Sequence, residues 1–97
     1  MVRIALIGCG RIGQMHAANL GKHKRTDLVM VFDADEKSAG KVAHLYGSKV
    51  AESSSEVFGA ENVDGVIIAS VTSTHAEFIE MAVAAGKPVL CEKPIDL

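Results

Sequence analysis

Residues 2–13 of this 97-residue sequence read VRIALIGCGRIG, an apolar run that leads directly into three closely spaced glycines. The run Val2–Ile7 is apolar apart from Arg3, which is typical of a strand in a parallel sheet that is covered on both faces. Apolar residues with helical spacing follow the glycines. The stretch therefore predicts a strand, a tight turn and a helix.

The glycines of this turn match the G-x-G-x-x-G pattern, with Gly8, Gly10 and Gly13 at its three fixed positions. They permit a tight turn, a close approach of a pyrophosphate to the backbone, and close packing of the helix on the strand. The helix that starts near Arg11 and Ile12 would point its unpaired N–H groups at the phosphates. Because the pattern follows a strand and opens a helix, it predicts a dinucleotide site and not merely a structural turn.

Strand and helix patterns alternate along the rest of the sequence. Further strands are predicted at residues 28–32, 50–51, 65–69 and 88–91. The βαβαβαβαβ order predicts an α/β fold of the Rossmann type: a doubly wound parallel sheet with strand order 3-2-1-4-5 in three α/β/α layers. Residues 1–97 form one domain, with a binding crevice at the carboxyl ends of the first and fourth strands.

Capping residues mark the ends of four helices. The predicted starts are Asp35 for the second helix and the capping boxes Ser53–Glu56 and Thr74–Glu77 for the third and fourth, and the predicted ends are Gly21, Gly47 and Gly86. Inner faces are expected from helical spacing: Ile12, Met15, His16 and Leu20 on the first helix, Ala39, Val42, Ala43 and Tyr46 on the second, and Phe78, Ile79 and Ala82 on the fourth.

Asp33 ends the second predicted strand, 20 residues after Gly13. An acidic side chain at this position can accept hydrogen bonds from both hydroxyls of an adenine ribose, and its charge would repel a 2′-phosphate. The alternative, a helix-capping role, is weaker because Asp35 can serve as the cap. Asp33 therefore favours NAD over NADP as the cofactor.

Polar residues also follow the fourth and fifth strands. Ser70, Thr72 and His75 lie in a hydroxyl-rich loop that suits the ribose, diphosphate and nicotinamide half of the cofactor. Helix capping alone would explain Ser73 or Thr74, and a core histidine with a satisfied hydrogen bond would explain His75 at least as well. Glu92 and Lys93 follow the last strand. Lys93 could hold a substrate hydroxyl and relay a proton during alcohol oxidation, and the alternative is a surface ion pair of little energetic value.

Composition excludes several other classes of function. The net charge of −2 gives no concentrated basic face for nucleic acid or an anionic membrane, and no apolar run reaches transmembrane length. A cytoplasmic location is expected, since no secretory pattern precedes the first strand. Cys9 and Cys91 show no metal-ligand spacing, and with one strand between theirs they would lie about 9–10 Å apart, too far for a disulfide.

These motifs resemble the glucose-fructose oxidoreductase and inositol dehydrogenase family over the whole chain. The resemblance rests on the glycine turn with Gln14 and His16, on Thr72–His75, and on Cys91–Leu97, which contains Glu-Lys-Pro. It implies that Lys93 is the catalytic lysine, that the Lys93–Pro94 bond could be cis, and that a ring hydroxyl is oxidised, as in myo-inositol to its 2-keto product. Val71 departs from the family, whose members usually have proline there.

The family also has a large substrate domain that this sequence does not contain. We therefore expect a truncated cofactor domain that binds NAD but oxidises little alone, since substrate positioning supplies much of the barrier reduction. A free-standing nucleotide-binding or sensing module without catalysis is the alternative. The unpaired edge of the fifth strand could also pair two copies into a homo-oligomer.

Overall fold

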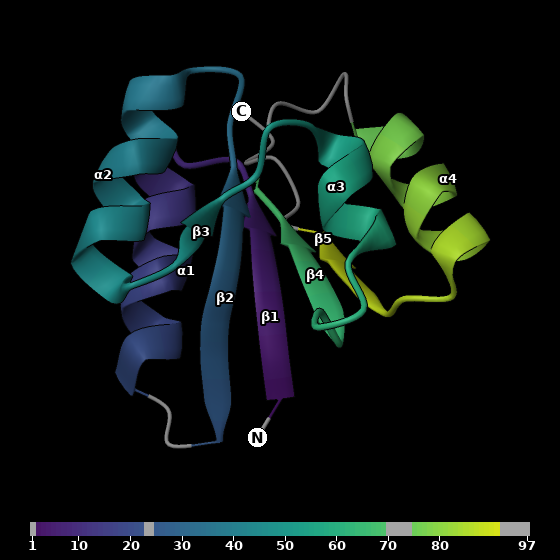
Figure 1. Ribbon diagram of the computed structural model, residues 1–97, viewed down its shortest axis with the longest axis horizontal. Helices are drawn as coiled ribbons and strands as arrows, with labels where there is room; N and C mark the ends of the chain where they lie inside the picture. Colours follow the sequence, from purple (N-terminus) through teal and green to yellow (C-terminus); the bar gives the residue numbers. More distant parts are fainter. Residues whose placement is uncertain (1, 23–24, 70–74, 92–97) are drawn as a thin grey trace, which may run out of the picture.

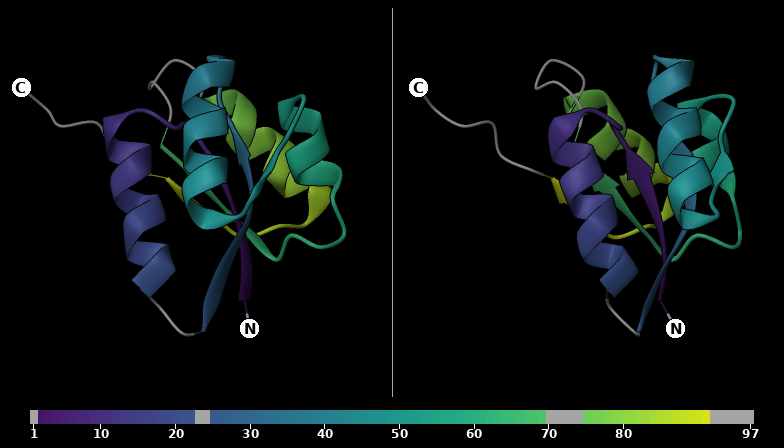
Figure 2. Two further views of the ribbon diagram at one scale, coloured as in Figure 1. Left: turned by 60° about the vertical axis from the view of Figure 1, so that its left-hand side comes forward. Right: turned by 90° about the vertical axis from the view of Figure 1, so that its left-hand side faces the viewer.

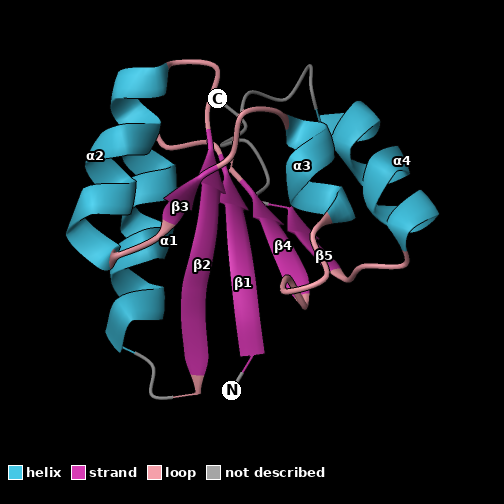
Figure 3. Cartoon of the chain, in the orientation of Figure 1, coloured by secondary structure: helices cyan, strands magenta, loops and turns pink. Residues whose placement is uncertain are grey.

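The structure is a computed structural model that describes residues 2–22, 25–69 and 75–91 (Figure 1). Its strands are β1 (Val2–Ile7), β2 (Thr26–Phe32), β3 (Lys49–Val50), β4 (Gly65–Ile68) and β5 (Val89–Cys91), and its helices are α1 (Arg11–Lys22), α2 (Glu36–Tyr46), α3 (Ser54–Gly59) and α4 (His75–Ala85). All neighbouring strands are parallel, in the order β3-β2-β1-β4-β5 (Figure 3). The predicted Rossmann-type topology is confirmed.

Helices cover both faces of the sheet, with α1 and α2 on one side and α3 and α4 on the other (Figure 2). Successive side chains of β1 point to opposite faces of the sheet, because side chains alternate along a strand. Leu6 packs in the core beneath α1 and α2, whereas Ala5 and Ile7 pack in the core beneath α3 and α4. Every residue of β4 is buried, as expected for a central parallel strand.

Three of the predicted helix ends are found as expected: Asp35 before α2, Gly47 after α2, and Gly86, at φ 71°, after α4. Asp35 caps α2 through a hydrogen bond from Lys37 N, and Gly47 ends that helix in the left-handed conformation at φ 68°. Ser53 Oγ accepts from Glu56 N at 3.3 Å, but Glu56 Oε1 accepts from Glu52 N and not from Ser53 N. The predicted capping box is therefore only half formed.

Close contacts between elements overturn three of the local predictions. Gly21 does not end α1, which continues to Lys22; a Cβ on Gly21 would lie 3.2 Å from the Tyr46 ring, so this glycine lets α1 and α2 approach. Met15 is 53% exposed, because Gly13 faces the sheet and a residue two positions later lies about 200° around the helix. Ile79 is 40% exposed, because Phe78 and Ala82 form the buried stripe of α4.

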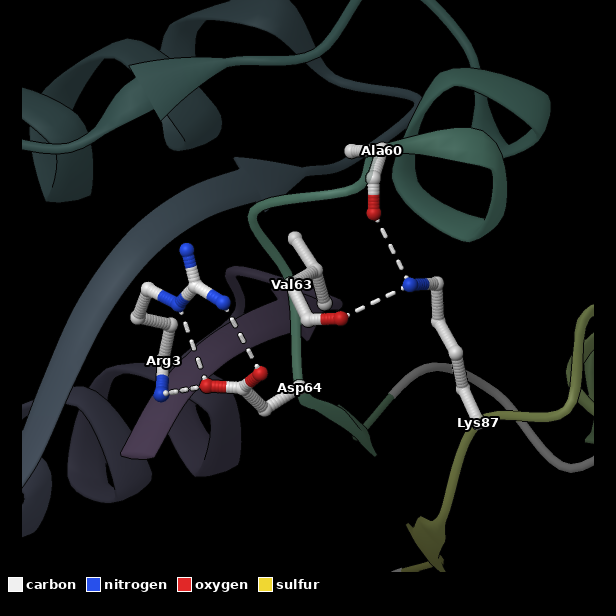
Figure 4. Close-up of polar contacts among 5 residues, drawn as sticks. All are labelled: Arg3, Ala60, Val63, Asp64 and Lys87. Atoms are coloured by element: carbon white, nitrogen blue, oxygen red, sulfur yellow. Dashed lines mark hydrogen bonds and ion pairs between the residues drawn. The ribbon is translucent and has the colours of Figure 1, made fainter. Parts of the chain in front are cut away.

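Polar contacts join the segments at the amino ends of the strands (Figure 4). Asp64 accepts three hydrogen bonds from Arg3, one from its backbone N and two from its guanidinium, at 2.8–3.1 Å. Lys87 Nζ donates to the carbonyl oxygens of Ala60 at 2.8 Å and Val63 at 2.7 Å. These contacts fix the turn before β4 at the edge opposite the glycine turn.

Candidate nucleotide-binding site

The glycine turn lies at the carboxyl edge of the sheet and is tied to both neighbouring strands. Gly8 has a positive φ of 100°, a conformation that favours glycine, and its N–H donates to Phe32 O at the end of β2. On the other side of β1, Ala69 N donates to Ile7 O. The turn therefore lies at the point between β1 and β4 where the strand order reverses, which is where ligands bind in open α/β folds.

Gly10 and Gly13 have different physical roles in this turn. A Cβ on Gly13 would overlap the carbonyl oxygen of Gly8 and lie 2.7 Å from its carbonyl carbon. A Cβ on Gly10 would meet no heavy atom within 4 Å. Packing thus requires glycine at position 13, whereas the space beside Gly10 is open to an incoming group.

Asp33 is held beside the glycine turn by two backbone groups. Its Oδ2 accepts from Cys9 N at 2.6 Å, and its Oδ1 accepts from Asp35 N at 2.8 Å. Asp35 separately caps α2, so Asp33 is not needed for that role. Each Asp33 oxygen retains further acceptor capacity, which a ribose hydroxyl could use.

A groove of about 520 Å³ adjoins Asp33 at the ends of β2 and β3. Its lining combines apolar and acidic side chains: Phe32, Asp33, Ala34, Glu36, Val50, Ala51 and Glu52. Glu36 and Glu52 add negative charge to that of Asp33. A neutral, hydroxyl-bearing group suits this groove better than a phosphate does.

Cys9 is fully buried between the turn and β2, and its Sγ donates to Phe32 O at 3.7 Å. Burial first, and then the charge of Asp33, raise the pKa of this thiol to about 12. Cys9 is therefore a packing residue and not a nucleophile at neutral pH. Its side chain matches the predicted buried thiol.

Gln14 is a further residue at the turn, to which the glycine pattern assigns no role. Its Nε2 donates to Cys9 O at 3.1 Å, and its backbone N donates to Gly10 O at 2.8 Å. The pattern of fixed glycines leaves position 14 unspecified. Only its place in the first turn of α1, next to the motif, could have drawn attention to it.

The structure brings only part of the predicted site into view. The turn from Gly8 to Gly13 and Asp33 lie together, although the side chains of Arg11 and Ile12 are not described. Ser70, Thr72, Glu92 and Lys93, together with Val71, Thr74 and the Lys93–Pro94 bond, lie outside the described residues. His75 begins α4 as its position predicts, but its side chain is not described.

The described part of the chain contains neither a candidate metal cluster nor a candidate membrane-spanning helix. Among residues 2–22, 25–69 and 75–91, no group of three or more His, Cys, Asp or Glu side chains could hold a metal ion. The described helices have at most 12 residues, and none is long and apolar enough to cross a membrane.

Comparison with known proteins decides the family. The model of an oxidoreductase family with an NAD-binding Rossmann fold matches residues 2–97. The chain belongs to this family. The resemblance to glucose-fructose oxidoreductases and inositol dehydrogenases is thereby confirmed, and NAD is the cofactor of the family fold.

Relatives of this NAD-binding oxidoreductase domain include several inositol dehydrogenases. An inositol 2-dehydrogenase of Rhizobium meliloti is 42% identical over 96 residues, which cover 99% of this chain and 29% of the relative. A myo-inositol dehydrogenase structure from Corynebacterium glutamicum aligns with a TM-score of 0.91 and 45% identity, covering 99% of this chain and 29% of that one. The chain therefore spans less than a third of the length of these relatives.

A third relative was solved with ligands. Scyllo-inositol dehydrogenase from Lactobacillus casei, with bound NAD(H) and scyllo-inositol, aligns with a TM-score of 0.90 and 30% identity, covering all of this chain and 29% of that one. The residues of our chain fit a dinucleotide on their own geometry. The space beside Gly10 is open. Asp33 lies close to this space, because its carboxylate accepts a hydrogen bond from Cys9 N, the residue before Gly10.

Proposed function

We propose that this chain is the NAD-binding domain of an inositol 2-dehydrogenase-like enzyme, which oxidises a ring hydroxyl of myo-inositol or a related polyol or sugar to a ketone. The observation that carries the proposal is the contact between Asp33 and the glycine turn. The Asp33 carboxylate lies beside the open backbone at Gly10, and this arrangement supports binding of the adenine ribose by Asp33 and of the pyrophosphate by the turn. The similarity to inositol dehydrogenases over 99% of the chain supports the substrate class.

The cofactor would be held by groups at the carboxyl edge of the sheet. Gly8, Gly10 and Gly13 shape the turn, and the first N–H groups of α1, at Arg11 and Ile12, would face the pyrophosphate. Asp33 would bind the ribose hydroxyls. Ser70, Thr72, His75 and Glu92 complete the proposed cofactor contacts on the sequence argument alone.

Lys93 is the proposed catalytic residue. An ammonium beside the reacting carbon can hold the substrate hydroxyl, and a lysine whose pKa is lowered by burial or a neighbouring charge can accept its proton. Bound NAD supplies the chemistry of hydride acceptance, while the protein binds and orients. The assignment of Lys93 rests on its place after β5 and on the family resemblance.

The substrate side of the reaction needs groups beyond this domain. The relatives are more than three times as long as the part that the chain matches, which supports a separate substrate domain in the complete enzyme. We therefore propose that the chain alone is nearly inactive, because it lacks the groups that position the substrate. A cytoplasmic location is included in the proposal, and the buried free thiol of Cys9 is compatible with a reducing compartment.

Chemical-shift mapping with NAD tests this assignment of residues. Backbone amide shifts should concentrate at residues 8–13, at Asp33, in the 70–75 loop and at residues 92–93. Shifts centred on the opposite edge of the sheet, near Arg3 and Asp64, would contradict it. In the same samples, adding myo-inositol should produce no appreciable NADH absorbance, and rapid inositol-dependent NADH formation would overturn the proposed inactivity.

A further inference from the structure

Gln14 holds two consecutive carbonyl groups of the glycine turn. Its side-chain Nε2 donates to Cys9 O at 3.1 Å, and its backbone N donates to Gly10 O at 2.8 Å. Gln14 itself belongs to the first turn of α1. The turn and the helix are thus joined by two hydrogen bonds from one residue.

The side-chain contact sets the orientation of a specific peptide group. The carbonyl of Cys9 and the N–H of Gly10 belong to the same trans peptide and point in opposite directions. When Gln14 holds the carbonyl, the Gly10 N–H must point away from Gln14. The peptide group before Cys9 is also fixed, because Cys9 N donates to Asp33 Oδ2 at 2.6 Å.

Such an arrangement matters for a ligand that binds through backbone groups. A flexible turn would have to be ordered when the pyrophosphate arrives, and that ordering would reduce the affinity. A turn held in advance by Gln14 avoids the cost. The open space beside Gly10 leaves the held backbone accessible.

We propose that Gln14 is a positioning residue for the pyrophosphate, acting through the Cys9–Gly10 peptide. The inference deepens the proposed function and rests on it. Gln14 does not need to touch the cofactor for this role. Its removal should affect ligands that carry a pyrophosphate and spare those that lack one.

The test compares ADP with adenosine as ligands of the wild-type chain and of Gln14→Met. Methionine has a similar length and helix propensity but no donor, so the fold should be retained. We expect Q14M to bind ADP about three- to tenfold more weakly, the effect of one neutral hydrogen bond, and to bind adenosine as the wild type does. Asn19→Ala, an exposed position on the same helix, is the matched control and should change neither affinity.

A second measurement uses the ligand-free protein. The Gly10 amide resonance should shift in Q14M but not in N19A. Unchanged ADP affinity in Q14M, or an equal loss for ADP and adenosine, would overturn the inference while leaving the proposed function intact. If the wild-type chain bound neither ADP nor NAD, the proposed function itself would fail, and this inference with it.

Discussion

Cys9 N donates a hydrogen bond of 2.6 Å to Asp33 Oδ2, and this contact joins the glycine turn after β1 to the end of β2. The two residues are 24 positions apart in the sequence. The carboxylate therefore has a structural role before any cofactor arrives. The carboxylate fixes the orientation of the Cys9 N–H, and this hydrogen bond also holds the Asp33 side chain in place.

Replacing Asp33 by alanine should reduce both cofactor affinity and stability. The part-buried Cys9 N–H would lose its partner, which costs about 1–3 kcal/mol of unfolding free energy, and the ribose would lose its acceptor. Calorimetric titration with NAD and denaturant unfolding measure the two effects. Asp27→Ala, an exposed carboxylate near the opposite end of β2, is the control, and a D33A variant as stable as D27A would contradict the structural role.

Gly13→Ala should destabilise the fold strongly. The added Cβ would overlap the carbonyl of Gly8, so α1 would have to move away from β1, at a cost of about 3 kcal/mol. Gly40→Ala in α2 is the matched control, since its Cβ meets open space and alanine favours a helix by about 1 kcal/mol. Thermal unfolding should place G13A below the wild type and G40A above it. Equal melting temperatures for the two variants would rule out the close packing of Gly13.

Gly10→Ala should reduce the affinity for NAD without reducing the stability of the fold. A Cβ at Gly10 meets no heavy atom of the protein within 4 Å, so the melting temperature should change little. The same methyl group would stand where the pyrophosphate approaches the backbone, so NAD affinity should fall about tenfold or more. A G10A variant that binds NAD as the wild type does would show that the cofactor does not approach this glycine.

The ion pair between Arg3 and Asp64 should stabilise the fold at neutral pH, and this contribution should be lost in acid (Figure 4). Hydrogen bonds from Arg3 lower the pKa of Asp64 to about 2, from an ordinary value of 3.8. A carboxylate whose folded pKa is depressed stabilises the fold above its unfolded pKa and loses that contribution as the pH falls through the folded value. The melting temperature gap between wild type and Asp64→Asn should therefore be constant near neutral pH and should close as the pH falls from about 4 to about 2.

Solvent screening provides a check on that prediction. Both side chains are about half exposed, at 45% and 40%, so the gap at neutral pH should be small and should shrink further in about 1 M salt. Glu61→Gln, at an exposed position in the turn before β4, is the control. A gap that grew on acidification would contradict the assignment of Asp64 as the stabilising carboxylate.

Local signals were sufficient to predict the order of the elements. Each strand, glycine turn and cap is encoded within a few residues, as at Gly8–Gly13 and at Asp35, and right-handed parallel connections then determine the sheet. Because the fingerprint includes a spacing to an acidic residue, the sequence also predicted Asp33 as a cofactor residue at the end of the second strand.

Contacts between distant elements could not be predicted in the same way. The rotation of α1 depends on the contact of Gly13 with Gly8, so the exposed Met15 was assigned to the wrong face. Gly21 resembles a helix end locally, yet it faces the Tyr46 ring. The hydrogen bond from Gln14 to Cys9 depends on the three-dimensional path of the turn, which the spacing of the glycines does not specify.

All the binding predictions depend on the proposal that Asp33 and the glycine turn form one site for NAD. Calorimetric titration of the wild-type chain with NAD and with NADP tests this proposal. NAD should bind, and NADP should bind at least tenfold more weakly, because the carboxylates of Asp33, Glu36 and Glu52 would repel the 2′-phosphate. Tighter binding of NADP, or no binding of either dinucleotide by the folded chain, would contradict the proposed NAD site.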